Sequence, residues 1–210
     1  MPFGAYDAAT HAVVRSRALL EVARQNTDLP TNVRADMRRL SVVLAVAALD
    51  TYMHRLIVER AYVHDELPFP LARLDVAFRD LLDWADSAAV AARGAPHQSR
   101  PRVAVKRQLR DRLLRETFQN FNDVGRALNM AGVARRWDLI GEQMTPGMGA
   151  EAIRSRLNGI VMRRNQIVHE GDYERLERPR GARRNTMYSH EARADIDFVA
   201  NLIDAIHATI

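Results

Sequence analysis

The chain has 210 residues and a hydrophobic content of 47%, which suit one domain with a substantial core. No run reaches the roughly 18 uncharged apolar residues that span a bilayer, and the N-terminus lacks the basic-then-apolar order of a signal peptide. Cysteine is absent, which excludes disulfides, thiolate nucleophiles and cysteine-based zinc sites. We therefore expect a cytoplasmic protein without a membrane segment.

The net charge of +5 and the sequence pI of about 10.2 favour polyanionic partners. Lys106 is the sole lysine among 31 basic residues, a bias more typical of codon composition than of a binding surface. Arginine still carries a planar fork that suits phosphate, so its abundance has a chemical consequence whatever its origin.

Apolar residues recur at intervals of three and four along nearly the whole chain, and Pro and Gly fall between these segments. The expected helices span residues 6–25, 32–63, 71–92, 103–130, 150–169 and 189–209. Thr31 and Ser189 are candidate N-caps of the second and the last helix. The segment 141–149, GEQMTPGMG, is expected to be a flexible connection. The pattern predicts an all-α fold, a single-domain bundle of about five or six helices over residues 1–210.

The fifth expected helix closes with a polar stretch, RRNQIVHEGDY. At about 100° per residue, Arg164 falls within roughly 20° of Ile153, in the middle of the face shared by the apolar side chains. A guanidinium centred on such a face is costly unless it is paired or reaches a cleft. Asn165 and His169 are four residues apart and lie above each other on the flanking side, and Gly171 then offers a helix stop.

Two interpretations of Arg164 are open. Its guanidinium can reach a cleft and take part in chemistry there, or it can pair with a carboxylate in the core. Asp50 is the best candidate for that carboxylate, because it interrupts the most apolar stretch of the chain, SVVLAVAALDTYM, and itself needs a partner.

Residues 164–169, RNQIVH, resemble the R-x4-6-H signature of the HEPN superfamily, including the polar residue directly after the arginine. The segments VAALDTYMHRLI and FQNFNDVGRAL extend the likeness toward the RiboL-PSP-HEPN group. The signature also lies where such proteins carry it, late in a helical bundle before one final helix. The resemblance implies a HEPN-like fold and a homodimer that brings two copies of the motif into one cleft.

The resemblance also implies an activity, that of a metal-independent endoribonuclease without a cofactor. The protein would act on RNA as a toxin or antiphage defence effector, restrained by an antitoxin or another regulatory partner. The implied catalytic residues are Arg164, Asn165 and His169, with Asp50 in support. Histidine exchanges protons near neutral pH, arginine braces the charge that builds on the phosphorane, and the amide orients the ring or donates to a phosphate oxygen. The expected products are a 2′,3′-cyclic phosphate and a 5′-hydroxyl end, formed equally well in EDTA.

One feature departs from HEPN toxins of the HepT-like kind, which carry H-x-Y. Here Glu170 and Gly171 follow His169, and Tyr173 lies further on. Regulation by modification of that tyrosine is therefore not implied.

Two basic regions are candidate RNA contacts. The first lies at the start of the fourth expected helix and comprises Arg102, Lys106 and Arg110. The second lies in the loop after the motif and comprises Arg178, Arg180, Arg183 and Arg184. Acidic neighbours dilute the charge of this loop, so we expect modest, salt-sensitive binding. The histidines show no ligand spacing, which argues against a metal site.

Two other functions fit the same residues. The first is a non-catalytic helical module that binds RNA, a nucleotide or a protein partner, with Arg164 kept for the fold or for dimerisation. The second is a structural bundle in which Arg164 pairs with Asp50. Replacing His169 with Ala separates the ribonuclease from both, because only the ribonuclease loses an activity.

Overall fold

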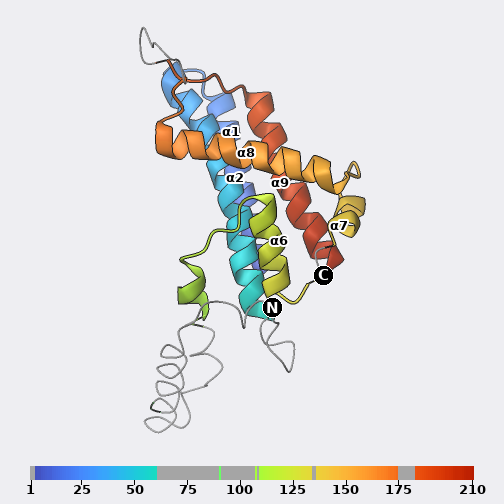
Figure 1. Ribbon diagram of the computed structural model, residues 1–210. Coiled ribbons are helices and arrows are strands. Elements are labelled where there is room, and N and C mark those ends of the chain that lie inside the picture. Colours follow the sequence, from blue (N-terminus) through green and yellow to red (C-terminus); the bar gives the residue numbers. More distant parts are fainter. Residues whose placement is uncertain (1–2, 61–89, 91–106, 108, 134–135, 175–182) are drawn as a thin grey trace. The chain divides into compact units, whose positions relative to one another are not determined.

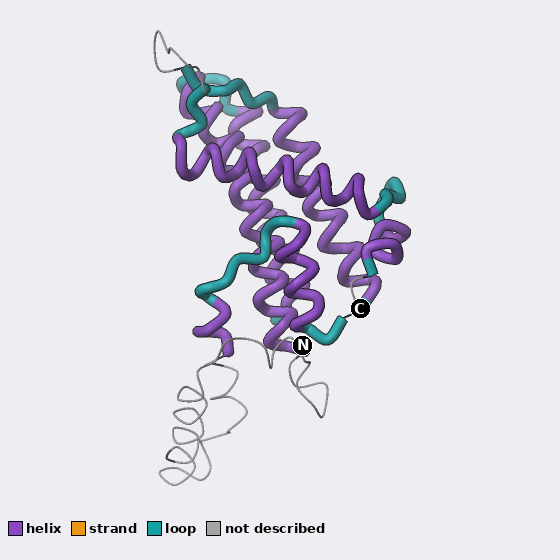
Figure 2. Tube along the Cα trace, viewed as in Figure 1, coloured by secondary structure: helices purple, strands orange, loops and turns teal. Residues whose placement is uncertain are grey.

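The structure, a computed structural model of the chain, describes residues 3–60, 90, 107, 109–133, 136–174 and 183–210. Within these ranges the regular secondary structure is helical, with loops between the helices and one isolated β-bridge, between Tyr173 and Arg184 (Figure 2). The all-α class is therefore confirmed for the described part of the chain.

The helices described in full are α1 (Ala5–Gln25), α2 (Thr31–Arg60), α6 (Phe121–Met130), α7 (Trp137–Gln143), α8 (Ala150–Glu170) and α9 (Ser189–Thr209) (Figure 1). The expected first, second, fifth and last helices are confirmed over their described residues. The expected helix over residues 71–92 lies outside the described residues, apart from residue 90.

Contacts divide the chain into two compact units. The first comprises Met1–Tyr52, Gln119–Asn122 and Arg136–Ile210, and the second comprises Met53–Phe118 and Asp123–Arg135. The single domain expected over residues 1–210 stays a prediction, since two such units can belong to one domain.

In the first unit α1 packs along α9, and α7 contacts both α9 and α8 (Figure 1). Leu20, Leu157 and Ile203 are among the side chains buried between these helices. The ion pair of Arg156 with Asp195, at 2.6 Å, joins α8 to α9. This packing fixes α8, the helix that carries the RNQIVH motif.

The α2 helix is long and apolar enough to cross a membrane by length and composition alone. Of its most apolar 18-residue window, 61% is buried inside the protein, which is the condition of a core helix. A helix that is apolar on most sides is expected in such a buried setting.

The expected fourth helix, 103–130, is wrong as a continuous element. Within its described part, the helix that includes Leu113 ends in a turn, and α6 begins only at Phe121. In the second unit Phe118 is fully buried, with its ring 4.9 Å from that of His54 and the guanidinium of Arg126 5.3 Å above it. The chain leaves the helix just before this buried ring, so a tertiary contact accompanies the break in the local periodicity.

Two other local expectations need correction. The segment 141–149 was expected to be a flexible connection, but its first residues belong to α7, which the sequence did not predict. Ser189 is the first residue of α9 rather than its cap. The cap position belongs to Tyr188, whose N–H donates to Glu191 Oε2 at 2.9 Å.

Candidate active site on α8

The C-terminal third of α8 leaves the core. Ile153, Leu157, Ile160 and Val161 are buried on one face, as the periodicity predicts, whereas Val168 is 47% exposed. Arg164 is half-buried rather than sealed in the core, so the expectation of a guanidinium centred on a buried face is corrected. The physical reason is that the buried stripe of α8 ends at Val161.

The contact of Arg164 is local. Its Nη1 donates to Asn165 Oδ1 at 3.0 Å. Asp50 is half-buried in α2 and has its own interaction partner, but it is not a described partner of Arg164. The two adjacent motif residues thus form one polar unit, with the guanidinium accessible at the surface of the helix.

His169 lies in the last turn of α8 and is exposed. The helix stops at Gly171, which adopts the left-handed conformation with φ of 64°. The carbonyl oxygen of Gln166 accepts from the N–H of Gly171 and from that of Asp172 at 3.0 Å. This cap, expected from the glycine, holds the backbone beside His169 while leaving its ring open to solvent.

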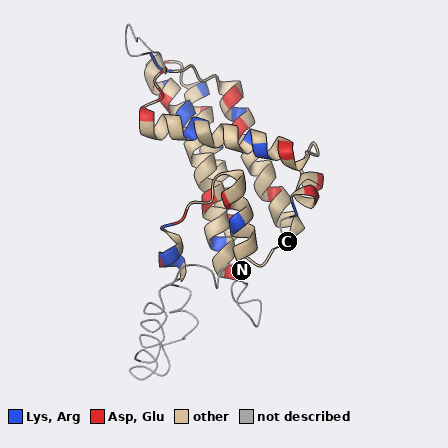
Figure 3. Cartoon of the chain, viewed as in Figure 1, with Lys and Arg blue, Asp and Glu red and all other residues tan. Residues whose placement is uncertain are grey.

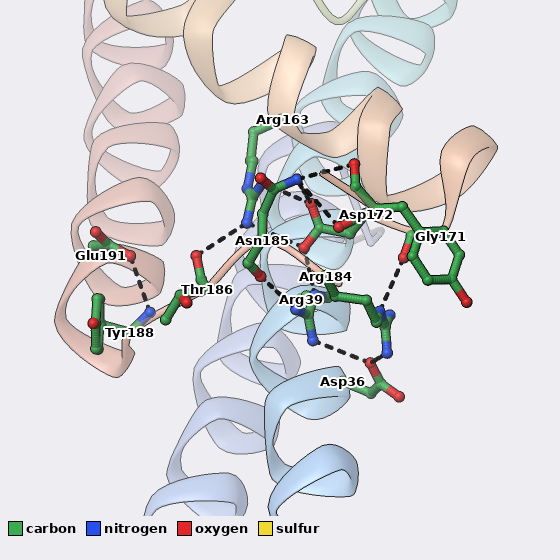
Figure 4. A network of polar contacts seen from close by, with 11 residues as sticks. Asp36, Arg39, Arg163, Gly171, Asp172, Arg184, Asn185, Thr186, Tyr188 and Glu191 are labelled. Atoms are coloured by element: carbon green, nitrogen blue, oxygen red, sulfur yellow. Dashed lines mark hydrogen bonds and ion pairs between the residues drawn. The ribbon is translucent and has the colours of Figure 1, made fainter. Parts of the chain in front are cut away.

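A buried carboxylate follows this cap. Asp172 is fully buried, and two guanidinium groups hold it (Figure 4). Arg39 Nε lies 2.6 Å from its Oδ2, and Arg163 Nη1 lies 2.6 Å from its Oδ1. Asn185 adds an amide donor to Oδ1 at 3.2 Å. The arginine of α8 that pairs with a buried carboxylate is therefore Arg163, the neighbour of Arg164, and not Arg164 itself.

Nothing in the sequence singles out Asp172, which is one of several acidic residues around the loop after the motif. Asp172 combines full burial with a φ of 61°, which is uncommon outside glycine. The network extends to Arg184, whose Nε donates to Gly171 O at 2.9 Å and whose Nη1 lies 2.6 Å from Asp36 Oδ1 (Figure 4). The loop after the motif is thus tied to α2 and to the end of α8.

An open pocket of about 510 Å³ runs along the exposed face of α8. Six of its lining residues carry an amide or a carboxylate: Asn120, Asn122, Asn158, Asn165, Gln166 and Glu170. Asn165 thus belongs both to the pocket wall and to the contact with Arg164. The sequence alone does not indicate the pocket, because its far wall comes from Asn120, just before α6, and Asn122, at the start of α6.

The expected RNA contacts fall into three groups. Arg102, Lys106, Arg178 and Arg180 lie outside the described residues. Arg110 and Arg183 are exposed, and Arg110 belongs to the second unit. Arg184 is engaged in the contacts with Asp36 and Gly171. Figure 3 shows acidic and basic residues interspersed along the described helices. The distribution of charge alone therefore does not indicate where on these helices RNA would bind.

Among the described residues, no group of three or more His, Asp or Glu side chains is placed to hold a metal ion. The chemistry that the described site offers rests on an arginine, an amide and an imidazole. A scan against models of known protein families and searches of curated proteins and of solved structures find no match.

Proposed function

We propose that this chain is a metal-independent endoribonuclease of HEPN type. The observation that carries the proposal is the division of labour between two adjacent arginines of α8. Arg163 neutralises the buried carboxylate of Asp172, whereas Arg164 bonds the side chain of Asn165 at the helix surface. A structural role explains the first arginine, and a phosphate-binding role suits the second.

The chemistry needs no group beyond those of the motif. His169, as a general base, takes the proton of a ribose 2′-hydroxyl, and the oxygen attacks the adjacent phosphorus. Arg164 stabilises the negative charge on the phosphorane, with its guanidinium oriented by Asn165. The 5′-oxygen leaves with a proton from a general acid, which gives a 2′,3′-cyclic phosphate and a 5′-hydroxyl end. In a homodimer the second copy of the motif supplies that acid.

The test compares His169→Ala with His11→Ala, which removes another exposed histidine, on α1. End-labelled RNA is resolved on denaturing gels with and without EDTA, and folding is checked by circular dichroism. We expect His169→Ala to abolish cleavage, His11→Ala to retain it, and EDTA to have no effect. Cleavage by the His169→Ala protein, or its loss in EDTA, contradicts the proposal.

The biological role in this proposal is that of a toxin or antiphage defence effector under the control of a partner. Expression of the wild-type chain without that partner then arrests growth, and expression of His169→Ala does not. Equal growth of the two strains at equal protein levels contradicts the role.

A second candidate is a non-catalytic module that binds RNA, a nucleotide or a protein partner. The observation that favours it is the exposed ring of His169, for which the described residues supply no orienting hydrogen bond. Binding of RNA by wild-type and His169→Ala proteins alike, with no cleavage by either, is the result expected of this module.

A further inference from the structure

Two of the amides that line the pocket along α8 have a fixed orientation. Asn158 Oδ1 accepts from the backbone N–H of Phe121 at 3.1 Å, and Asn165 Oδ1 accepts from Arg164 Nη1 at 3.0 Å. A backbone N–H and a guanidinium can only donate, so the oxygen of each amide faces these groups. The amide nitrogen of each residue is then left to donate to a ligand in the pocket.

A carboxylate, which only accepts hydrogen bonds, lies beside a further amide at the C-terminal end of the pocket. Gln166 and Glu170 are four residues apart on α8, so their side chains are neighbours on the helix surface, and both line the pocket. Glu170 already has an interaction partner, but a carboxylate has about four lone-pair sites and can accept further hydrogen bonds. An amide, which can donate as well as accept, and a carboxylate acceptor therefore lie side by side, one on each side of His169 in the sequence.

Guanine presents the complementary groups on its Watson–Crick edge. Its N1–H and N2–H donors are adjacent and suit the carboxylate of Glu170, and its O6 acceptor beside them suits the amide N–H of Gln166. Met162, which is 63% exposed, gives the pocket an apolar surface against which the face of a base can lie. The volume of about 510 Å³ is within the range of small-ligand pockets and is large enough for a nucleotide.

We propose that this pocket binds an unpaired guanine of single-stranded RNA, with Gln166 and Glu170 as the residues that select the base. The identity of the ligand as RNA rests on the proposed ribonuclease function. The strand must be single, because pairing with cytosine occupies the edge that Glu170 and Gln166 contact. A guanine seated here lies beside the turn that carries His169, so the pocket selects the nucleotide next to the cleaved bond.

The test measures binding in the His169→Ala background, where RNA is not consumed. Fluorescence anisotropy compares labelled oligouridines that carry G, A, C or U at one central position. We expect the G-containing strand to bind at least about tenfold more tightly than the others, the discrimination typical of a good bidentate base contact. Pairing the same strand with its complement abolishes this preference.

Two near-isosteric substitutions probe the selecting groups separately. Glu170→Gln removes the carboxylate, and Gln166→Glu removes the amide donor, and each reduces the preference for G to near unity. Glu151→Gln, which removes the same charge from an exposed position on the same helix, retains the preference. Equal binding of the four strands, absence of binding, or a G preference unchanged in either pocket variant overturns the proposal.

The cleavage assay with wild-type protein distinguishes failure of this inference from failure of the proposed function. A preference for G without cleavage supports the pocket and removes the ribonuclease. Cleavage without a preference for G supports the ribonuclease and removes the pocket assignment.

Discussion

Arg39 and Asp172 are 133 residues apart in the chain, yet Arg39 Nε lies 2.6 Å from Asp172 Oδ2. Both side chains are nearly inaccessible, at 5% and 0% exposed. Asp172 comes three residues after His169 and directly after the glycine that ends α8. The pair therefore anchors the end of the motif helix to α2, and the position of the candidate site depends on an interaction that lies outside the motif.

Asp172→Asn tests this anchor. Asparagine has the same shape and tolerates the left-handed conformation at φ of 61°, so the change removes the charge with little effect on the backbone. It removes the buried carboxylate that binds Arg39 and Arg163, and leaves Arg39 with Asp36 Oδ1, at 3.3 Å from its Nη1. We expect the free energy of unfolding to fall by about 3–5 kcal/mol. Urea unfolding followed by circular dichroism measures the change.

The matched control for that variant is Asp197→Asn. Asp197 pairs with Arg17 at 2.8 Å, but both side chains are over 40% exposed, so the loss should stay within about 0–1 kcal/mol. Equal losses in the two variants would mean that burial of the Asp172 network adds nothing to stability.

The adjacent arginines of α8 should separate stability from activity. Arg163→Lys replaces a fork that binds Asp172 Oδ1 and the carbonyl oxygen of Thr186, and should cost about 1.5–3 kcal/mol of stability. Arg164→Lys should leave stability within about 0.5 kcal/mol and lower RNA cleavage by about a hundredfold or more. Thermal unfolding and cleavage rates measured on both proteins give the comparison. A loss of activity confined to Arg163→Lys would show that Arg163, and not Arg164, contacts the phosphate.

Local signals were sufficient for the helix that carries the site. The apolar period of three and four and the glycine at position 171 placed α8 within one residue of its observed end. The same signals failed for the expected fourth helix, because the burial of Phe118 against His54 depends on residues far away in the sequence. The short α7 was missed because its seven residues are too few to show a helical period.

The candidate site was predicted in part for the same reason. Arg164, Asn165 and His169 belong to one contiguous motif, so their shared placement on α8 follows from the helix alone. The partner of Arg163 could not be found this way, because Asp172 becomes buried only through contact with α2 and with Asn185. An ion pair between residues far apart in the chain produces no periodic pattern in the sequence from which it could be predicted.

Asp195 on α9 gives a prediction for pH dependence. It is 9% exposed, and burial raises the pKa of its carboxyl above the ordinary value of 3.8, although Arg156 at 2.6 Å opposes the shift. The folded chain therefore holds this proton more tightly than the unfolded chain. The stabilising contribution of the Asp195 carboxyl is fully present below pH 3.8, and it is lost as the pH rises through the folded-state pKa.

Asp195→Asn lacks this titration, so its stability relative to the wild type should rise from about pH 3 to about pH 7. Urea unfolding of both proteins at several pH values measures the difference in stability. The contributions of the other carboxyl groups are nearly the same in the two proteins and largely cancel in this difference. A relative stability that falls over the same interval would show that the attraction of Arg156 outweighs burial, and that the pKa is lowered instead.

Two glycines near the site helix should respond to alanine with opposite signs. A Cβ added at Gly141, in α7, would lie 1.9 Å from the backbone oxygen of Met148, so the loop that leads into α8 must move. We expect Gly141→Ala to lower the free energy of unfolding by about 1–3 kcal/mol.

Gly159, exposed in the middle of α8, has no atom within 4 Å of an added Cβ. Gly159→Ala should therefore raise stability by roughly 0.5–1 kcal/mol, because alanine is the better helix former. Thermal and urea unfolding measure both changes, and a destabilised Gly159→Ala protein would indicate that another molecule or segment packs against this face of α8.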